Sequence, residues 1–195
     1  MTDTLNSLKS ENSMYEALAI ANYFLDRFNN KLNPMKLEKL CFFAYMWNLV
    51  LYKNPLFIEM ILVDEFGIRI ISIYNEFRLA GNDVIRSKGL IYDFDSDKFV
   101  KAKINMDDVQ TVNLLNKIIE VYGDYSSLEL SAILRKEDGL FDIINKQYPN
   151  RRYMNIPDKL IQEYGLKQLN KMNGEKNLAK ILPFERKENK NGNRK

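Results

Sequence analysis

The chain has 195 residues, a length that suits one domain with a sizeable core. With 46% hydrophobic and 28% charged residues, its composition excludes a fibrous repeat and disorder of the whole chain. It has no histidine and a single cysteine, Cys41, which excludes an intramolecular disulfide and a histidine-based catalytic triad. No apolar run reaches the roughly 18 residues needed to cross a bilayer, so we expect a cytoplasmic protein with no membrane partner.

The net charge of +3 lies in one segment of the chain. Residues 185–195 hold five Lys or Arg and two Glu, so the rest of the chain is neutral overall. Nucleic-acid binding usually depends on Lys and Arg gathered on a folded face. We therefore do not expect nucleic acid as a partner, and a nucleic-acid-associated regulator acting through this segment is a less favoured alternative.

Composition also divides the chain into three parts. Residues 1–12 are polar and aperiodic, which predicts a flexible leader. Residues 13–173 carry the hydrophobic periodicity of a single domain. Residues 174–195 lose that periodicity and end in a charge block, which predicts a weakly ordered to disordered basic tail.

Two amphipathic helices are predicted in the first third of the chain. Residues 13–28 place apolar side chains at spacings of three and four. A second helix is predicted from Pro34 to Tyr52, because Asn33 can cap it and proline is tolerated at its first position. Apolar residues surround this second helix more widely than a surface helix requires, so we expect it at the centre of the core.

The rest of the chain predicts short strands and further helices. Extended segments are expected at residues 56–66 and 89–104, with a helix between them that stops at Gly81. The helices expected after these are residues 107–122, residues 126–135 with a Ser126 and Glu129 capping box, residues 140–147, and one from Ile156-Pro157 that is interrupted or ends near Gly165. The predicted fold is α+β and predominantly α-helical, a compact helical domain with a small antiparallel sheet or hairpin.

Candidates for metal binding and catalysis are weak. Asp93, Asp95 and Asp97 alternate like the start of a calcium loop. Lys98 and Ile104 occupy the positions that would need glycine and glutamate, so we expect a polar hairpin turn there instead. Cys41 lies in an apolar stripe, where a thiol is usually an inert core group. We therefore predict no catalytic residue, no metal and no cofactor.

A run of residues in the first half of the chain resembles a known family. The segment 35–47 reads MKLEKLCFFAYMW, Pro55-Leu56-Phe57 follows it, and Phe66-Gly67 precedes Tyr74 by seven residues. This pattern resembles the Panacea domain family, whose members include SocA-like and phage-associated GepA-like proteins. The resemblance spans roughly residues 15 to 165.

The chain departs from the pattern of that family at three places. Ile68 stands where the family has proline after glycine, Leu134-Arg135 replaces a threonine-histidine pair, and Phe141 replaces a tryptophan.

The resemblance implies an antitoxin-like protein that neutralises a cognate toxin, often encoded next door, by direct protein–protein binding. It also leaves open a proteolytic adaptor that hands a bound toxin to a protease, or a phage or mobile-element regulatory protein. A carboxylate-based enzyme is the alternative from another class.

The partner-binding surface is expected around the second helix and the segment after it. Lys36 and Lys39 are three residues apart, which predicts that both head groups point to the same side of the helix. The following strand has to fold back on this helix to share its core, which would bring Arg69 and Tyr74 near the two lysines. Aromatic residues are also crowded in the second helix, and some of them could be exposed anchors. The predicted partner-binding residues are Lys36, Lys39, Trp47, Arg69 and Tyr74.

Overall fold

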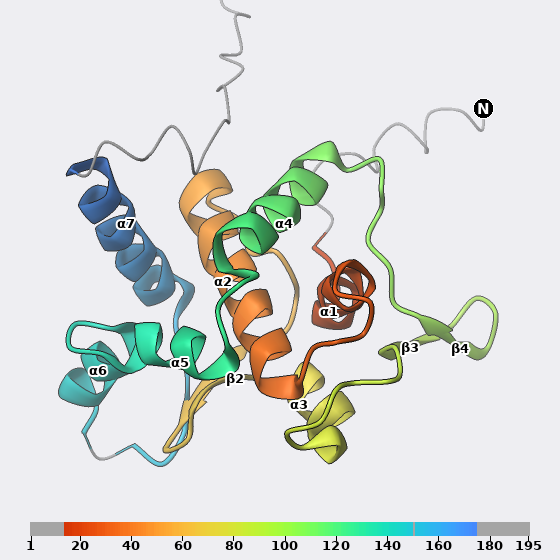
Figure 1. Cartoon of the computed structure of the whole chain (residues 1–195), viewed down its shortest axis with the longest axis horizontal. Coiled ribbons are helices and arrows are strands. Elements are labelled where there is room, and N and C mark those ends of the chain that lie inside the picture. Colours follow the sequence, from red (N-terminus) through yellow and green to blue (C-terminus); the bar gives the residue numbers. More distant parts are fainter. Residues whose placement is uncertain (1–13, 150, 175–195) are drawn as a thin grey trace, which may run out of the picture.

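A computed structural model describes residues 14–149 and 151–174 (Figure 1). Its α-helices are α1 (Ala17–Arg27), α2 (Pro34–Tyr52), α3 (Ile71–Phe77), α4 (Val109–Tyr122), α5 (Ser127–Arg135), α6 (Leu140–Gln147) and α7 (Asp158–Gly174), and a 3-10 turn, η1 (Arg78–Ala80), follows α3. The predicted leader of residues 1–12 lies outside the described residues. So does the predicted tail, except for Gly174, with which α7 ends.

Helix α2 occupies the centre of the molecule, as its sequence predicts. Helices α1, α4, α5 and α7 pack around it (Figure 1). Every residue of α2 from 37 to 50 is buried. A helix that is apolar on all sides is stable in water only when other elements cover all of those sides.

Side-chain caps fix the starts of α2 and α5. The Asn33 carboxamide oxygen accepts the backbone N–H of Lys36 at 2.8 Å, and Pro34 follows as the first helical residue. The Ser126 hydroxyl accepts the N–H of Glu129 at 3.2 Å, and the Glu129 carboxylate accepts the N–H of Ser126 at 2.7 Å. Both predicted caps are confirmed, and each satisfies helix N–H groups that have no partner within the helix.

A three-stranded antiparallel sheet lies against the first half of α2. Its strands are β1 (Ile61–Asp64), β2 (Gly67–Ile70) and β5 (Met154–Asn155), in the order β2-β1-β5. The extended segment expected at residues 56–66 thus contains a shorter strand than predicted, and the chain turns at once into β2. Strand β5 was missed, because two residues carry no periodicity.

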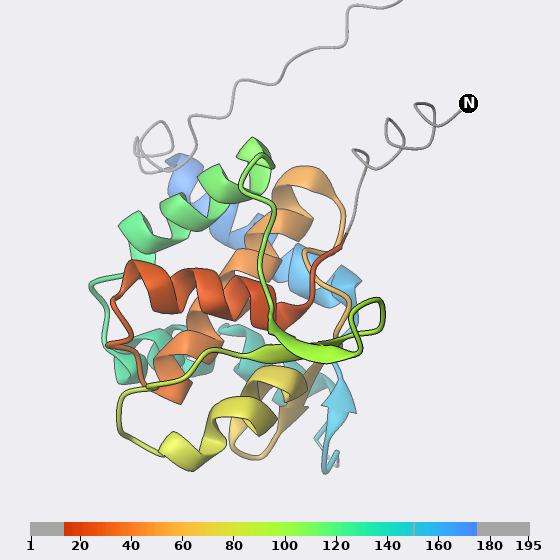
Figure 2. The ribbon, with the colours of Figure 1, turned by 90° about the vertical axis from the view of Figure 1, so that its right-hand side faces the viewer.

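A separate hairpin of β3 (Leu90–Asp93) and β4 (Lys98–Lys101) extends beside α1 (Figure 2). Its base is tied to α1 by the buried side chain of Asn22. The Asn22 amide donates to the carbonyls of Gly89 and Ala102 at 2.8 Å each and accepts the N–H of Gly89 at 2.7 Å. At the turn, Asp93 accepts the Ser96 hydroxyl at 2.6 Å, which confirms the predicted polar hairpin turn.

The last helix corrects one prediction. Helix α7 runs through Gly165 without a break. A Cβ atom at this position would lie 2.5 Å from Val50 Cγ2 and 3.1 Å from Met46 Cγ on α2. Gly165 therefore allows α7 to pack closely against α2, and it is not a stop signal.

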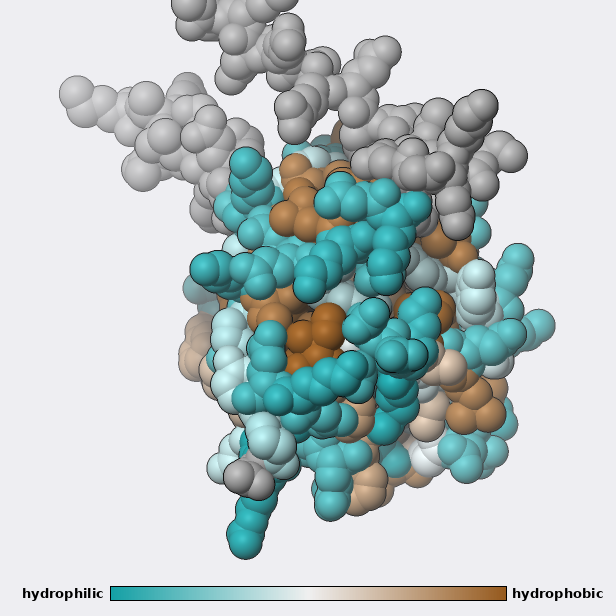
Figure 3. Space-filling view, turned by 90° about the vertical axis from the view of Figure 1, so that its left-hand side faces the viewer, coloured by the Kyte–Doolittle hydropathy of each residue, from teal (hydrophilic) through white to brown (hydrophobic). Residues whose placement is uncertain are grey.

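Together these elements form an α+β, mainly helical fold with a small antiparallel sheet, which confirms the predicted fold class. On the face that carries α6 and α7, apolar side chains reach the surface in separate patches among hydrophilic ones (Figure 3). Within the described ranges, no helix is long and apolar enough to cross a bilayer.

Candidate functional site

A groove of about 930 Å³ is the candidate site. It lies between the start of α2, the β1–β2 turn, α3 with η1, and α5. Three of the five predicted partner-binding residues line it, namely Lys39, Arg69 and Tyr74. A second cavity of about 680 Å³ lies near Tyr15 and contains none of the five.

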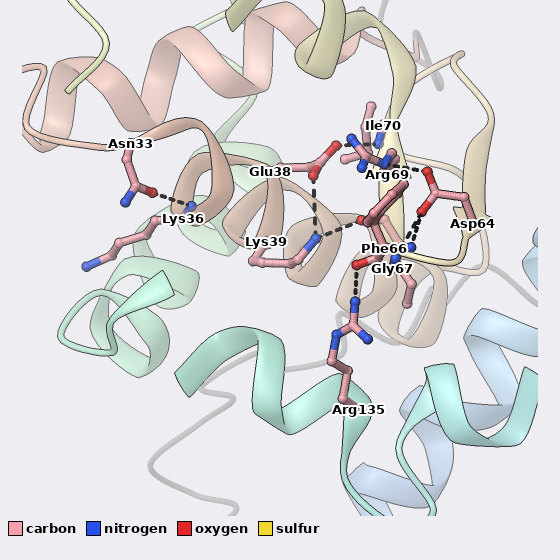
Figure 4. A network of polar contacts seen from close by, with 11 residues as sticks. Asn33, Lys36, Glu38, Lys39, Asp64, Phe66, Gly67, Arg69, Ile70 and Arg135 are labelled. Atoms are coloured by element: carbon pink, nitrogen blue, oxygen red, sulfur yellow. Dashed lines mark hydrogen bonds and ion pairs between the residues drawn. The ribbon is translucent and has the colours of Figure 1, made fainter. Parts of the chain in front are cut away.

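Glu38 and Lys39, which line the groove, form hydrogen bonds with backbone groups at the outer edge of β2. The Glu38 carboxylate accepts the N–H of Ile70 at 2.9 Å, and the Lys39 ammonium donates to the carbonyl of Ile68 at 2.7 Å (Figure 4). The ammonium also lies 3.4 Å from the Glu38 carboxylate. The two side chains thus occupy backbone groups that an exposed edge strand would offer to another chain.

Lys39 is a buried cation, contrary to the expectation of an exposed one. The residue is 8% exposed. Burial lowers the pKa of Lys39, an effect that the Glu38 carboxylate opposes and the charges of Arg69 and Arg135 increase. Lys39 donates to the carbonyl of Ile68, next to Arg69 on β2, and Arg135 donates to a carbonyl of the adjoining β1–β2 turn, so three cations lie at this end of the groove.

Arg69 is held in place by a carboxylate and two rings. Its Nε atom lies 2.7 Å from the Asp64 carboxylate. Its guanidinium lies over the Tyr74 ring, 4.3 Å from the centroid, and 5.6 Å from the centroid of Phe66. The other Asp64 oxygen accepts the N–H groups of Phe66 at 2.8 Å and Gly67 at 3.0 Å. Asp64 therefore fixes both the β1–β2 turn and the arginine beside it.

Arg135 reaches the same turn from α5. Its guanidinium donates to the carbonyl of Phe66 (Figure 4) and lies over the Phe141 ring, 4.4 Å from the centroid. Arg135 and Phe141 were not among the predicted site residues. The only signal for them in the sequence was that both depart from the family pattern.

Lys36 lies outside the groove, which overturns the prediction that it shares a surface with Lys39. Its ammonium donates to the carbonyl of Gly123, at the end of α4, at 2.6 Å, and lies 5.3 Å from the centroid of the Phe28 ring. Burial lowers the pKa of Lys36, while the carboxylates of Asp124 and Glu129 raise it. The two long side chains extend in different directions from α2 (Figure 4), because each follows the nearest backbone carbonyl.

Trp47 is also outside the groove. It is 4% exposed, and its indole N–H donates to the Tyr122 hydroxyl at 3.0 Å. The other aromatic residues offered as exposed anchors in α2 are buried as well, except for the half-buried Tyr52. Trp47 is therefore a core residue, because α4 and α7 cover the faces of α2 that a surface helix would expose.

Positions that depart from the family pattern meet in the groove. Ile68 on β2, Leu134 and Arg135 at the end of α5, and Phe141 on α6 all line it. They are far apart in the sequence and come together only because α5 and α6 lie across from the β1–β2 turn.

Cys41 is completely buried, and burial raises the pKa of its thiol well above the usual value. Among the described residues, no three Asp, Glu or Cys side chains are grouped as metal ligands.

No model of a known protein family matches this chain, and neither a curated protein sequence nor a solved structure matches it. The resemblance to the Panacea domain family therefore stays a prediction that rests on the residues quoted for it.

Proposed function

We propose that this protein is an antitoxin-like binding protein that neutralises a cognate toxin in the cytoplasm by direct contact, and that the groove is its contact surface. The toxin is expected to be encoded in a neighbouring gene. The function rests on the resemblance, and the place of the contact rests on the groove.

One observation carries the choice of surface. The groove gathers Lys39, Arg69 and Tyr74 with residues from α5 and α6, and it includes the three named departures from the family pattern, at Ile68, Leu134-Arg135 and Phe141. In a family with diverse toxins, residues that differ between members are expected where partners are distinguished.

Binding is favoured over catalysis by the state of the ionisable groups in the groove. Lys39 pairs with Glu38, and Arg69 pairs with Asp64. Arg135 is bound to a backbone carbonyl. A general acid or base needs a pKa near the working pH and access to a substrate proton, and arginine stays protonated at all such pH values. The groove is therefore better suited to recognition.

Co-expression with the neighbouring gene tests this proposal. The wild-type protein should restore growth to cells that produce the toxin, and Arg69→Glu combined with Arg135→Glu should abolish the rescue. Arg86→Glu is the matched control, because Arg86 is exposed and lies outside the groove. Full rescue by the folded double variant would remove the groove as the contact surface. Failure of the wild-type protein to rescue would refute neutralisation itself.

The amount of toxin in the rescued cells separates two modes of action. If the protein blocks the toxin by occupying its surface, the toxin should accumulate as a stable complex. If the protein instead delivers the toxin to a protease, the toxin should disappear, and it should return in cells without that protease.

A further inference from the structure

We propose that the groove binds an acidic segment of the partner protein that carries both carboxylates and apolar side chains. This inference rests on the proposed binding function and specifies the chemistry of what is bound.

The charges of the groove are unbalanced. Five cationic residues line it, and the only carboxylate among the lining residues is Glu38. The Glu38 carboxylate already forms an ion pair with Lys39 and accepts an N–H group of β2. Asp64 already forms an ion pair with Arg69 and accepts N–H groups of the β1–β2 turn. Arg78, Arg135 and Lys136 have no ion pair within the part of the chain that the structure describes. The bound segment must therefore supply negative charge if these cations are to be compensated on binding.

Two of the cations are already oriented for carboxylates. Arg69 and Arg135 each stack one face of the guanidinium on an aromatic ring, at 4.3 Å from Tyr74 and 4.4 Å from Phe141. Stacking leaves the N–H groups in the plane of the guanidinium available, and these are the groups that carboxylates accept from in pairs. Arg69 is also anchored by its ion pair with Asp64, and Arg135 by its hydrogen bond to the carbonyl of Phe66. Little side-chain freedom remains to be lost on binding.

The apolar part of the groove excludes a purely ionic ligand. Large apolar side chains remain exposed along it, with exposed fractions of 68% for Phe66, 72% for Leu128 and 41% for Met35. These side chains come from the β1–β2 turn, α5 and α2, so they border the groove on different sides. A bound segment would gain free energy by covering them, because apolar surface would be removed from water.

A phosphate or nucleotide fits this groove less well than a peptide. Phosphate sites typically use the free N–H groups at a helix N-terminus. At the two longer helices that border the groove, the Asn33 side chain already accepts the N–H of Lys36 at the start of α2, and the Ser126 side chain accepts that of Glu129 at the start of α5. The groove therefore offers side-chain cations next to apolar surface, which is what an acidic and apolar segment requires.

Selection from a display library of random twelve-residue peptides tests the inference with purified protein. Peptides retained by the wild-type protein should be enriched in Asp and Glu together with Leu, Phe or Met. An enriched peptide, made with a fluorescent label, should bind at least tenfold more weakly when its acidic residues are replaced by the corresponding amides. Its affinity should also fall as salt is raised.

Variants locate the binding to the groove. Arg69→Gln and Arg135→Gln should each lower the affinity for the labelled peptide at least tenfold. Arg86→Gln should leave that affinity unchanged. Inorganic pyrophosphate should displace the peptide poorly. Enrichment without acidic residues, no enrichment at all, or displacement by pyrophosphate at equal concentration would overturn the inference.

These outcomes are independent of the cell-based test of function. If toxin neutralisation depends on Arg69 and Arg135 but no acidic peptide is selected, the proposed function stands and the acidic chemistry of the segment is refuted. If acidic peptides bind the groove but no neighbouring toxin is neutralised, the chemistry stands and the antitoxin-like function is refuted.

Discussion

At the scale of single residues, Lys36 and Lys39 show how one residue type takes two roles on one helix. Lys36 donates to the end of α4, and Lys39 closes the edge of β2. The Lys36 ammonium is placed at a helix C-terminus, where a cation is favoured by the helix dipole. Lys39 belongs instead to a buried ion pair, where the loss of one partner leaves the other uncompensated.

Replacing these two lysines should therefore have unequal effects on stability. Lys39→Met should lower the free energy of unfolding by about 3–5 kcal/mol, because the Glu38 carboxylate stays buried without its cation. Lys36→Met should cost about 1 kcal/mol, the usual contribution of one hydrogen bond near the surface. Urea unfolding followed by circular dichroism measures both.

Glu38→Gln in the Lys39→Met background is the matched control. The double variant removes the buried charge and keeps an acceptor for the N–H of Ile70, so it should recover part of the lost stability. Equal destabilisation by Lys36→Met and Lys39→Met would show that the two lysines are equivalent and that the ion pair has no special role.

At the scale of elements, the close packing of α7 on α2 explains a glycine inside a long helix. A Cβ atom at position 165 would overlap with Val50 and crowd Met46. Glycine is therefore required by the neighbouring helix, although it weakens α7 on its own. Helix propensity favours a residue with a side chain at this position, whereas packing against α2 requires glycine, and the packing effect is the larger one.

Gly165→Ala should thus lower the thermal midpoint. In an exposed helix this change stabilises by about 1 kcal/mol. In α7 the overlap with Val50 should cost about 1–3 kcal/mol and outweigh that gain. Thermal unfolding followed by calorimetry gives the sign directly.

Val50→Ala provides the compensating change for this experiment. It removes the Cγ2 atom that lies 2.5 Å from the added Cβ. The double variant should therefore be less destabilised than the sum of the two single variants. A higher midpoint for Gly165→Ala alone would mean that α7 and α2 are further apart than the structure places them.

At the scale of the whole molecule, buried tyrosines link stability to alkaline pH. Tyr164 on α7 belongs to the core around α2, and the partly buried Tyr122 on α4 packs against that core. Burial is the main cause that raises the pKa of each to about 12 from the ordinary value of 10.0. Their phenol groups therefore stay protonated in the folded protein at pH values where the unfolded chain has lost those protons.

The free energy of unfolding should fall as pH rises from about 10 to about 12. In this window the unfolded chain binds fewer protons than the folded one, so each increase in pH favours unfolding. For each group, a difference of one in pKa between the folded and the unfolded state changes the free energy of unfolding by about 1.4 kcal/mol. Urea unfolding at a series of pH values measures the slope.

Tyr122→Phe should reduce that slope, because phenylalanine has no proton to lose. It should also lower stability at neutral pH by about 1 kcal/mol, since the Trp47 N–H loses its acceptor. An unchanged slope in this variant would show that Tyr122 does not titrate with unfolding.

The sequence by itself determined the local features of this protein. The Asn33 cap, the capping box of Ser126 and Glu129, and the all-round apolar character of α2 were predicted and confirmed, because each depends on residues within a few positions of one another. The α+β fold class followed from the same periodicities.

Only the tertiary structure decided which residues make the groove. Arg69 and Arg135 come from segments 66 positions apart, and they meet because α5 lies across from the β1–β2 turn. The directions of Lys36 and Lys39 were likewise decided by the carbonyls of Gly123 and Ile68. A long side chain turns towards whichever polar group the packing brings near it, and sequence spacing along one helix contains no information about that group.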